Sequence, residues 1–317
     1  MTRPRIVTFS RRTDGGLYID FLVDKVRKGS THVPNPMTGK PYTVSLRPED
    51  VALLSVWTKA PNLVVPALEE LRRTYRERLS VFVTITGYGG TWMEPEVPTI
   101  DVALEGVRRI REKVTVSQAV VWRYDPIVLT ERTFTEQWHV ENFASLCQSW
   151  KGLTGRVIVS NVHVSGSYEP VGRALAARTA SQGDRLRLLG YADFVNLAYR
   201  LKAIADAHDI SLGVCCSPKI APEHTAQVGL RNTACVNPID LAAMNLSLAT
   251  IGKSRNQRKG ASSLSYAECT CGDTIDIGAT HTCQHGCAYC YANRSRAVLE
   301  RIEATAPWLS DRVLSSD

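Results

Sequence analysis

The stretch DTIDIGATHTCQHGCAYCYANRSRAVLERIEATA (273–306) reads as a strand, a loop and a helix in succession. Residues 273–279 have the β-branched side chains of a short strand, and residues 291–306 read as a helix. A strand followed by a helix is the unit from which parallel sheets are built. This part of the chain therefore predicts a βα unit whose connecting loop carries three cysteines.

Earlier parts of the chain repeat the same alternation of strand and helix. Helical spacing relates Ala103, Val107, Ile110 and Val114, and residues 191–209 read as another long helix. GYGG (87–90) lacks the spacing of a dinucleotide fingerprint. We therefore expect an α/β fold, a TIM-like full or partial (βα) barrel. The other strand candidates are RIVTFS (5–10), LLSVWTK (53–59), SVFVTITG (80–87), AVVWRY (119–124), RVIVSNVHV (156–164) and ISLGVCC (210–216).

The chain divides into three expected segments. Residues 1–251 supply the βα units of the barrel, with a Pro- and Gly-rich hairpin inserted near 31–46. Residues 252–272 form a basic linker that contains the pair Cys269 and Cys271. Residues 273–317 then complete the barrel with the strand, the cysteine loop and the helix.

Composition indicates a folded protein that is not embedded in a membrane. Of the 317 residues, 44% are hydrophobic and 22% are charged, and no apolar run is as long as a membrane span. The start of the chain lacks the apolar region of a signal peptide, so we expect a cytoplasmic protein. A formal net charge of +7 mildly favours a nucleic acid or another anionic substrate.

The loop CQHGCAYC (283–290) holds three thiols rather than the four of an ordinary tetrahedral metal site. Cys283, Cys287 and Cys290 are separated by three residues and then by two, and Tyr289 precedes the last cysteine. Iron–sulfur clusters and zinc ions both bind cysteine thiolates. A four-iron cluster held by three cysteines keeps one iron open for another ligand.

The spacing and the tyrosine resemble the cluster loop of radical S-adenosylmethionine enzymes. The resemblance implies a [4Fe–4S] cluster on Cys283, Cys287 and Cys290, with S-adenosylmethionine on the open iron and Tyr289 near its adenine. It also implies reductive cleavage to a 5′-deoxyadenosyl radical that abstracts hydrogen from a substrate. A reductant such as flavodoxin or ferredoxin would supply the electron.

In that family the cluster loop follows the first barrel strand, whereas here it comes last. A circular permutation accounts for this order, because the first and last strands of a barrel are neighbours. The whole chain also resembles an uncharacterised domain-of-unknown-function family, with SRRTD (10–14), WTK (57–59), TGYG (86–89) and RYDP (123–126) segments. That second resemblance implies no particular activity.

The remaining cysteines suggest a second metal centre, either another iron–sulfur cluster or a zinc ion. The expected ligands are Cys216, Cys235, Cys269 and Cys271, which places Cys215 on the opposite strand face. Burial as ordinary core cysteines is the alternative for Cys215 and Cys235. Cys147 is expected to be a core residue.

Polar side chains at the predicted strand ends are candidates for binding S-adenosylmethionine, because barrel chemistry sits at these ends. An internal network of Arg–Asp ion pairs is the alternative reading. Lys59 and Tyr88 are expected to line the same mouth. The candidates are Arg11, Arg12, Asp14, Thr86, Arg123 and Asp125.

The leading interpretation is thus a permuted radical S-adenosylmethionine enzyme. One alternative is a zinc-stabilised protein that binds nucleic acid through the basic linker. Its closed zinc site would have four cysteines, or three cysteines with His281 or His285 as the fourth ligand. Another is an electron-transfer protein with fully ligated iron–sulfur clusters. The substrate is left open between a nucleic acid, a phosphorylated metabolite and a peptide.

Overall fold

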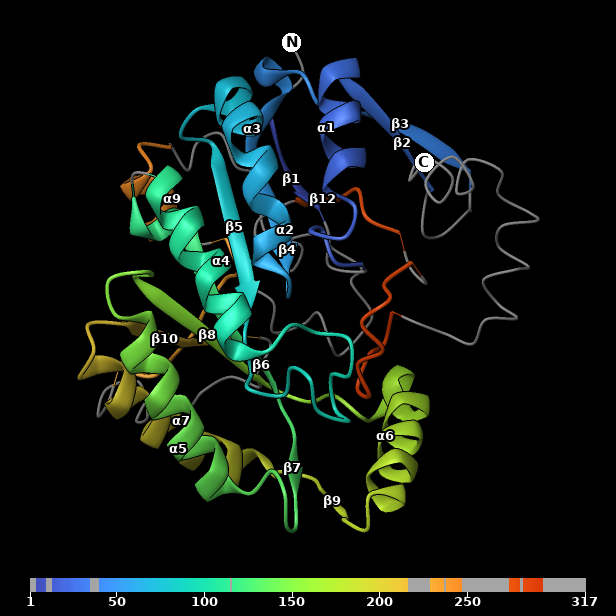
Figure 1. Cartoon of the computed structure of the whole chain (residues 1–317), viewed down its shortest axis with the longest axis vertical. Helices are drawn as coiled ribbons and strands as arrows, with labels where there is room; N and C mark the ends of the chain where they lie inside the picture. The colour runs from blue at the N-terminus through green and yellow to red at the C-terminus, as the bar shows by residue number, and fades with distance from the viewer. Residues whose placement is uncertain are drawn as a thin grey trace.

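The computed structural model describes residues 4–9, 13–34, 40–114, 116–215, 229–236, 238–246, 274–279 and 282–292. Within these ranges the chain forms an α/β fold around one parallel sheet (Figure 1). From edge to edge the strands are β11 (Arg231–Asn232), β10 (Ser211–Val214), β8 (Arg156–Asn161), β6 (Val120–Ile127), β5 (Leu79–Thr84), β4 (Val51–Thr58), β1 (Arg5–Phe9) and β12 (Thr274–Asp276).

Every neighbouring pair of strands in this sheet is parallel. From β1 to β11 the spatial order follows the chain order, without the reversal that marks a dinucleotide-binding sheet. The exception is β12, which comes last in the chain but pairs with β1 through Ile6 and Thr274. The strand of the C-terminal βα unit expected from the sequence therefore lies beside the first strand. Residues 293–306 of its expected helix and the expected linker 252–272 lie outside the described residues.

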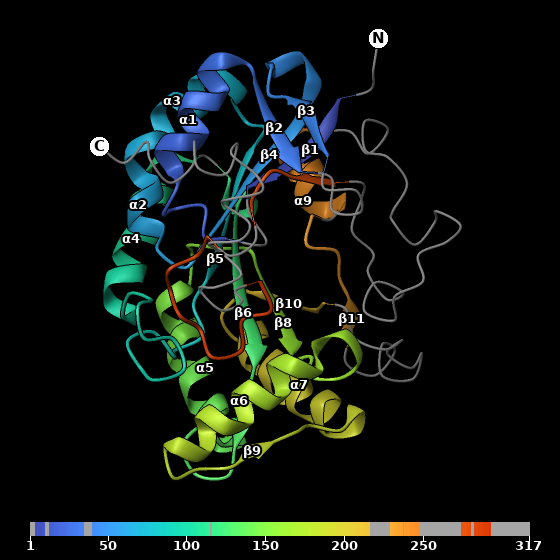
Figure 2. The same ribbon diagram turned by 90° about the vertical axis from the view of Figure 1, so that its right-hand side faces the viewer.

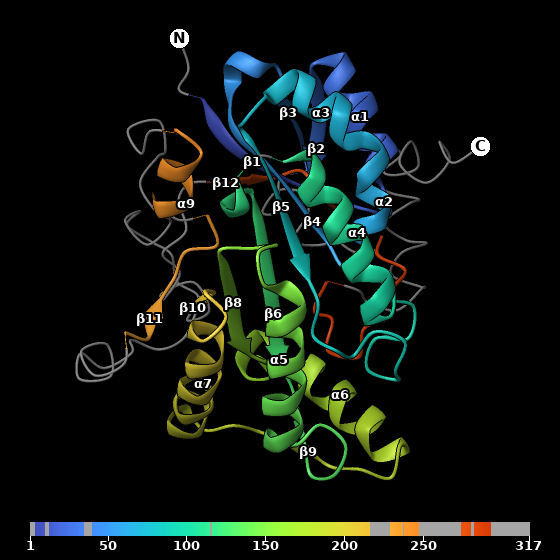
Figure 3. The same ribbon diagram turned by 60° about the vertical axis from the view of Figure 1, so that its left-hand side comes forward.

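Helices connect the strands and cover one face of the sheet, as Figure 3 shows for α2 to α5. Helix α3 contacts β4 and β5, and α7 contacts β8 and β10. No helix among the described residues is long and apolar enough to cross a membrane. The helices are α1 (Ile19–Lys28), α2 (Pro61–Val64), α3 (Leu68–Tyr75), α4 (Ile100–Lys113), α5 (Glu136–Trp150), α6 (Glu169–Ser181), α7 (Tyr191–Asp206) and α9 (Pro238–Ala243).

Two antiparallel pairs lie outside the main sheet. Strands β2 (Ser30–Pro34) and β3 (Pro41–Ser45) form one pair within the range expected for a hairpin. Strands β7 (Leu129–Thr130) and β9 (Leu186–Arg187) form the other, next to α6.

The core lies between the sheet and its helices. Strand β4 is buried along nearly its whole length, which is typical of a parallel strand covered on both faces. Trp122 of β6 stacks on Phe143 and Trp150 of α5, with ring centroids 5.1 and 5.4 Å apart. These contacts fix α5 against the sheet, and Cys147 of the same helix is fully buried, as expected for a core cysteine.

The C-terminal edge of the sheet positions the cysteine loop. In Figure 2 the segment 282–292, drawn in red, crosses in front of the strands, while α1 to α4 lie to one side. Because the strands are parallel, their C-terminal ends meet at one edge, and the loop that follows β12 lies over that edge.

Candidate functional site

The cysteine loop follows the C-terminal end of β12 directly. Cys283, Cys287 and Cys290 are each half-buried, and none forms a disulfide. The backbone turns tightly here, because the amide of Cys290 donates to the carbonyl of Cys287 at 3.1 Å. The eleven described residues of the loop thus carry three cysteine thiols.

Burial disfavours the thiolate form of two of these thiols. Burial raises the pKa of Cys283 to about 12, and the negative charge of Asp14 adds to this effect. Burial also raises the pKa of Cys287, although the positive charge of Lys59 opposes it. Without a bound cation these sulfurs therefore keep their protons, and a metal that coordinated them would displace those protons.

His285 anchors the loop to the segment that follows β1. Its Nε2 lies 2.9 Å from Oδ2 of Asp14, and its Nδ1 lies 3.0 Å from the carbonyl oxygen of Glu96. Both side chains are almost fully buried. Since two acceptors face the two ring nitrogens, the arrangement suits a protonated imidazole that donates to both.

The charges of the two partners support this assignment. Burial acts to lower the pKa of His285, but the hydrogen bond and the negative charge of Asp14 outweigh it and raise the pKa. Burial acts to raise the pKa of Asp14, but His285, with the amide of Lys59 and the hydroxyl of Thr58, lowers it. Asp14 and His285 therefore form a buried ion pair between the ends of β1 and β12.

The turn at Asp14 requires glycine next to it. A Cβ on Gly15 would lie 2.8 Å from the carbonyl oxygen of Phe9, and one on Gly16 would lie 2.7 Å from Oγ1 of Thr58. The amide of Gly16 also donates to Oδ1 of Asp14 at 2.8 Å. The sequence DGG thus brings the carboxylate close to the end of β4.

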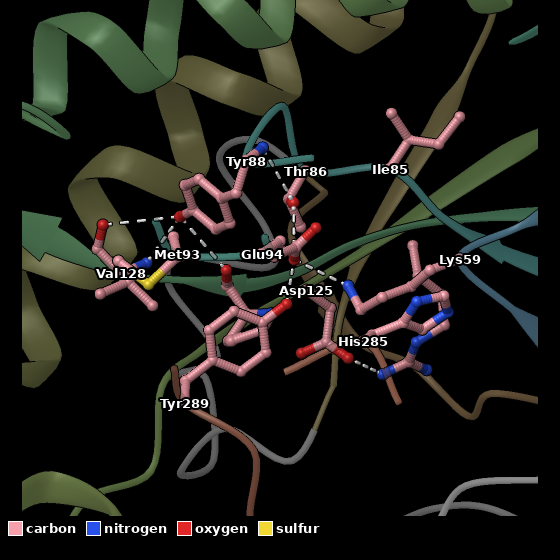
Figure 4. Close-up of polar contacts among 12 residues, drawn as sticks. Lys59, Ile85, Thr86, Tyr88, Met93, Glu94, Asp125, Val128, His285 and Tyr289 are labelled. Carbon is pink, nitrogen blue, oxygen red and sulfur yellow. Dashed lines mark hydrogen bonds and ion pairs between the residues drawn. The ribbon is translucent and has the colours of Figure 1, made fainter. Parts of the chain in front are cut away.

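Glu94 is the second anchor of the loop (Figure 4). Its Oε1 accepts hydrogen bonds from Lys59 Nζ at 2.8 Å, from Thr86 Oγ1 at 3.1 Å and from the hydroxyl of Tyr289. The Glu94 side chain is only 1% exposed. Lys59 also lies over the Tyr289 ring, with Nζ 5.5 Å from the ring centroid. These contacts hold the aromatic residue of the motif in one orientation.

Backbone contacts complete the attachment of the loop to residues 88–97. The amide of Ala288 donates to the carbonyl of Met93 at 2.9 Å, and the amide of Glu96 donates to the carbonyl of His285 at 3.3 Å. Gly286 has a φ of +64°, which favours glycine between His285 and Cys287. The loop therefore depends on the segment after β5 for its shape.

The segment GYGG (87–90) lies where the backbone passes close to other parts of the chain. A Cβ on Gly87 would lie 2.4 Å from Oδ1 of Asn142, and one on Gly89 would lie 2.2 Å from the carbonyl oxygen of Pro98. Tyr88 is fully buried in a small apolar cluster with Met93 and Phe134. These glycines allow the chain to pack against itself.

Arg123 and Asp125 form an ion pair at the end of β6, and Ser160 donates to the same carboxylate. The guanidinium carbon of Arg123 lies 4.6 Å from the centroid of the Trp57 ring. Burial acts to lower the pKa of Arg123, but the charge and hydrogen bond of Asp125, together with Cys235 and Cys215, outweigh it and raise the pKa. Burial acts to lower the pKa of Lys59. The charge of Glu94 and, to a smaller extent, that of Asp125 act to raise it. These charges thus connect the Glu94 anchor with the end of β6.

Of the predicted site residues, the structure brings together Cys283, Cys287, Cys290, Tyr289, Asp14 and Thr86. Arg123 and Asp125 lie beside this group, because Asp125 is close enough to Lys59 for its charge to help raise the lysine's pKa. Arg11, Arg12, Cys216, Cys269, Cys271 and His281 lie outside the described residues.

Cys235 and Cys215 do not have the expected arrangement. The expectation placed Cys215 on the opposite strand face, but its Sγ lies 3.7 Å from that of Cys235. Strand β11 brings Cys235 alongside the end of β10, a pairing that the sequence did not predict. Among the described residues no three His, Cys, Asp or Glu side chains are arranged to hold a metal ion in this conformation.

Glu94 was not predicted as a site residue, and the role of Lys59 was predicted only in outline. A signal for Glu94 existed, because GGTWMEPE (89–96) places an acidic side chain in the loop directly after a predicted strand. Its contact with Tyr289, however, spans 195 positions of the chain.

The donor set fits an iron–sulfur cluster in its chemistry. Three thiols lie on one loop, the aromatic residue before the third is held by Glu94, and both anchors of the loop use side chains other than the cysteines. Thiolates are ligands that iron–sulfur clusters and other soft metal ions prefer.

The chain was compared with known proteins and solved structures. Two solved chains overlap with it at low similarity: one from work on the pneumococcal virulence factor StrH and N-glycan recognition and hydrolysis, the other from work on the tandem GH20 catalytic modules of the pneumococcal exo-β-D-N-acetylglucosaminidase StrH. Their TM-scores are 0.34 and 0.33 at 10% and 11% identity, over 98% of this chain and 82% and 84% of theirs. Likeness at this level carries no conclusion.

No curated protein matches the chain significantly in sequence. The family model described as "Domain of unknown function (DUF1848)" matches residues 6–292, which is most of the chain and includes the whole cysteine motif. The chain therefore belongs to the DUF1848 family.

Proposed function

We propose that this chain is a radical S-adenosylmethionine enzyme and that Cys283, Cys287 and Cys290 hold a [4Fe–4S] cluster with one open iron. The observation that carries the proposal is the position of the motif. The three thiols lie on a loop that directly follows an edge strand of a parallel sheet, and Tyr289 is held beside them by Glu94. Barrel enzymes place their reactive groups at this end of the strands.

The strand order supports a partial barrel whose chain is circularly permuted. The spatial order runs from β12 to β1 and then in chain order to β11. When each right-handed connection leads from one parallel strand to the next strand on the same side, all the helices lie on one face of the sheet. This arrangement favours curling of the sheet towards a barrel. If β12 is counted first, all eight strands follow in order.

A [4Fe–4S] cluster held by the three thiols would supply the electron for reductive cleavage of S-adenosylmethionine. The protein's own residues would position the reactants. Asp14 and His285 fix one side of the loop, and Glu94 fixes Tyr289 on the other. Arg123 and Asp125 would face the carboxylate and the ammonium of the cofactor's methionine part.

The partners of the reaction follow from the same proposal. A reductant such as flavodoxin or ferredoxin would deliver the electron. The substrate would be a nucleic acid or a phosphorylated metabolite, which the formal net charge of +7 mildly favours.

Anaerobic reconstitution with iron and sulfide tests the proposal. We expect a brown protein whose spectrum changes on addition of S-adenosylmethionine and which forms 5′-deoxyadenosine under strong reduction. Cys287→Ala should abolish that product, because the cluster would lose one of its three protein ligands.

The matched control is Cys147→Ala, which removes a thiol buried in α5 and away from the loop. This variant should keep both the iron and the product. If the wild-type chain binds only zinc after reconstitution, or if Cys287→Ala still forms 5′-deoxyadenosine, the proposal is wrong.

A further inference from the structure

A pair of cysteines lies near the β11 edge of the sheet, apart from the cysteine loop. Cys215 directly follows β10, and Cys235 comes three residues after β11. Because β10 and β11 are parallel neighbours, both cysteines leave the sheet at its C-terminal edge. Their sulfur atoms are 3.7 Å apart, and each residue is 8% exposed.

The backbone on both sides of this pair is well anchored. The amide of Cys215 donates to the carbonyl of Val159 at 2.9 Å, and the amide of Thr233 donates to the carbonyl of Val214 at 2.7 Å. Arg156 donates from Nη1 to the carbonyl of Ala234 at 3.1 Å and from Nη2 to that of Cys235. The two thiols are therefore held in contact by the fold.

Two sulfurs in contact can approach to a bond by a small rotation of their side chains. A disulfide needs a sulfur separation of about 2.05 Å, so the gap to close is roughly 1.7 Å. A tetrahedral metal ion, by contrast, needs four donors. Among the described residues no third His, Cys, Asp or Glu side chain completes such a site here. The geometry thus suits a bridge between two sulfurs better than a metal centre.

Arg123 distinguishes the two cysteines. Its Nη1 donates to Sγ of Cys235 at 3.2 Å, while the same guanidinium pairs with Asp125. A fixed positive charge stabilises a thiolate, and the thiolate is the reactive form of cysteine. Cys235 is therefore the sulfur better placed to attack an oxidant, and Cys215 is placed to resolve the product.

We propose that Cys215 and Cys235 form a redox-active dithiol that a peroxide converts to a disulfide. The Cys235 thiolate attacks one peroxide oxygen, the O–O bond breaks, and the sulfur becomes a sulfenic acid as hydroxide leaves. The Cys215 thiol then displaces the sulfenic oxygen, which leaves as water, and the S–S bond forms. Each turnover oxidises two thiols and reduces one hydrogen peroxide to two waters.

The bridge would also change the neighbouring site. Once the sulfur of Cys235 is part of a disulfide it carries no negative charge, so Arg123 faces only Asp125 as a charged partner among the contacts given above. The redox state of the cysteine pair would thus change the charges around Arg123 at the end of β6. This inference does not depend on the proposed function.

Differential alkylation of the full chain tests the proposal. The reduced protein is treated with hydrogen peroxide, the remaining thiols are blocked, and the digested peptides are identified by mass spectrometry. We expect the peptide with Cys215 to be joined to the peptide with Cys235, and a dithiol reductant to separate them. Cys147 should stay reduced, since burial raises its pKa to about 12.

Two single substitutions assign the roles. Cys215→Ser should prevent the bridge and leave a sulfenic acid on Cys235 that dimedone traps. Cys235→Ser should prevent both the bridge and the trapping. Replacement of Arg123 by Met should slow oxidation about tenfold through loss of the thiolate-stabilising charge, and Arg123→Lys should slow it less.

Three outcomes would overturn the proposal. The first is that peroxide leaves Cys215 and Cys235 fully open to alkylation. The second is that the bridge persists in Cys215→Ser, which would assign Cys216 as the partner. The third is that the isolated chain holds one zinc ion that either serine variant releases, which would make the pair metal ligands. None of these results bears on whether the loop 282–292 supports cleavage of S-adenosylmethionine.

Discussion

Glu94 is a centre of polar contacts in the site that the sequence did not predict. Its carboxylate is nearly inaccessible to water, yet it accepts from a lysine, a threonine and a tyrosine. Burial of a carboxylate is costly unless charge and hydrogen bonds compensate it, and Lys59 supplies the charge. Burial acts to lower the pKa of Lys59, but the negative charge of Glu94, its hydrogen bond and the charges of Cys287 and Asp125 together outweigh it and raise the pKa.

Glu94→Gln should therefore destabilise the protein. The change keeps the shape of the side chain but leaves the ammonium of Lys59, whose side chain is 15% exposed, without its closest negative partner. We expect a loss of about 2 to 3 kcal/mol in the free energy of unfolding, at the low end for a broken buried pair because Lys59 keeps some contact with water. Urea denaturation monitored by circular dichroism measures this loss.

Glu96→Gln is the matched control two residues away. The Glu96 side chain is exposed, and only its backbone contacts His285. Its effect should stay within about 0.5 kcal/mol. Equal losses for the two substitutions would show that the Glu94 carboxylate is not a structural anchor.

Prediction from sequence reaches residues that local spacing marks and misses those that the fold brings together. Cys283, Cys287, Cys290 and Tyr289 could be identified because their spacing is readable within eight positions. The partner of Tyr289 could not, because Glu94 is 195 positions distant. The alternation of side chains along a strand predicts that Cys215 and its sequence neighbour point to opposite faces. It does not predict which residue of the adjacent strand lies next to Cys215.

At the scale of elements, α5 is attached to β6 by a buried polar group as well as by aromatic stacking. His139 of α5 is fully buried, with Nδ1 2.7 Å from the hydroxyl of Tyr124 and Nε2 3.0 Å from the carbonyl oxygen of Val128. A neutral imidazole accepts at Nδ1 and donates at Nε2 in this arrangement. Burial lowers the pKa of His139 to about 4, although the hydrogen bond to Val128 opposes the shift.

His139 should make the protein sensitive to acid. Its pKa is about 4 in the folded chain against 6.5 when exposed, so the unfolded state binds the proton more tightly. The stabilisation is complete above about pH 6.5 and is lost as the pH falls towards 4, by roughly 3 kcal/mol in all. Chemical denaturation at pH 7, 5.5 and 4 measures this change.

His139→Gln should be less stable at pH 7 but should lose less of its remaining stability on acidification. His163→Gln, in which an exposed histidine is replaced, should keep the wild-type dependence on pH. An unchanged slope in His139→Gln would mean that another group controls acid unfolding.

The elements themselves were predictable where the pattern was strong. All seven strand candidates correspond to strands of the sheet, and α7 lies within its expected range. Helix α4 contains Ala103, Val107 and Ile110, three of the four residues related by helical spacing. Strand β11 was missed because it is two residues long and consists of Arg231 and Asn232, which give no apolar signal. Short strands of this kind form because a neighbouring edge offers unpaired backbone groups, which no local pattern encodes.

At the scale of the whole molecule, the cysteine loop joins segments from both ends of the chain. His285 binds Asp14 after β1, and Tyr289 binds Glu94 after β5 together with Lys59 after β4. The parallel sheet brings these segments to one edge. The loop therefore takes its shape from the order of strands in space and does not require its place at the end of the sequence.

A rearranged chain should consequently fold to the same structure. We consider a variant that begins between Leu246 and Thr274, runs to residue 317, continues through a Gly/Ser linker into residue 1 and ends at Leu246. Its strands then follow in the spatial order from β12 to β11, and the new ends interrupt no described helix or strand. A flexible linker on the order of 20 residues adds little to the free-energy cost of closure. We expect its thermal midpoint to lie within about 5 °C of the original, a difference of roughly 1 to 2 kcal/mol.

The control places the new ends between Gly89 and Gly90, which separates Thr86 from Glu94 and cuts the segment that holds the cysteine loop. This control should lose far more stability, measured by differential scanning calorimetry on both variants. If the first variant fails to fold while the second remains stable, the position of β12 beside β1 depends on the native chain order, and the permuted-barrel interpretation loses its structural basis.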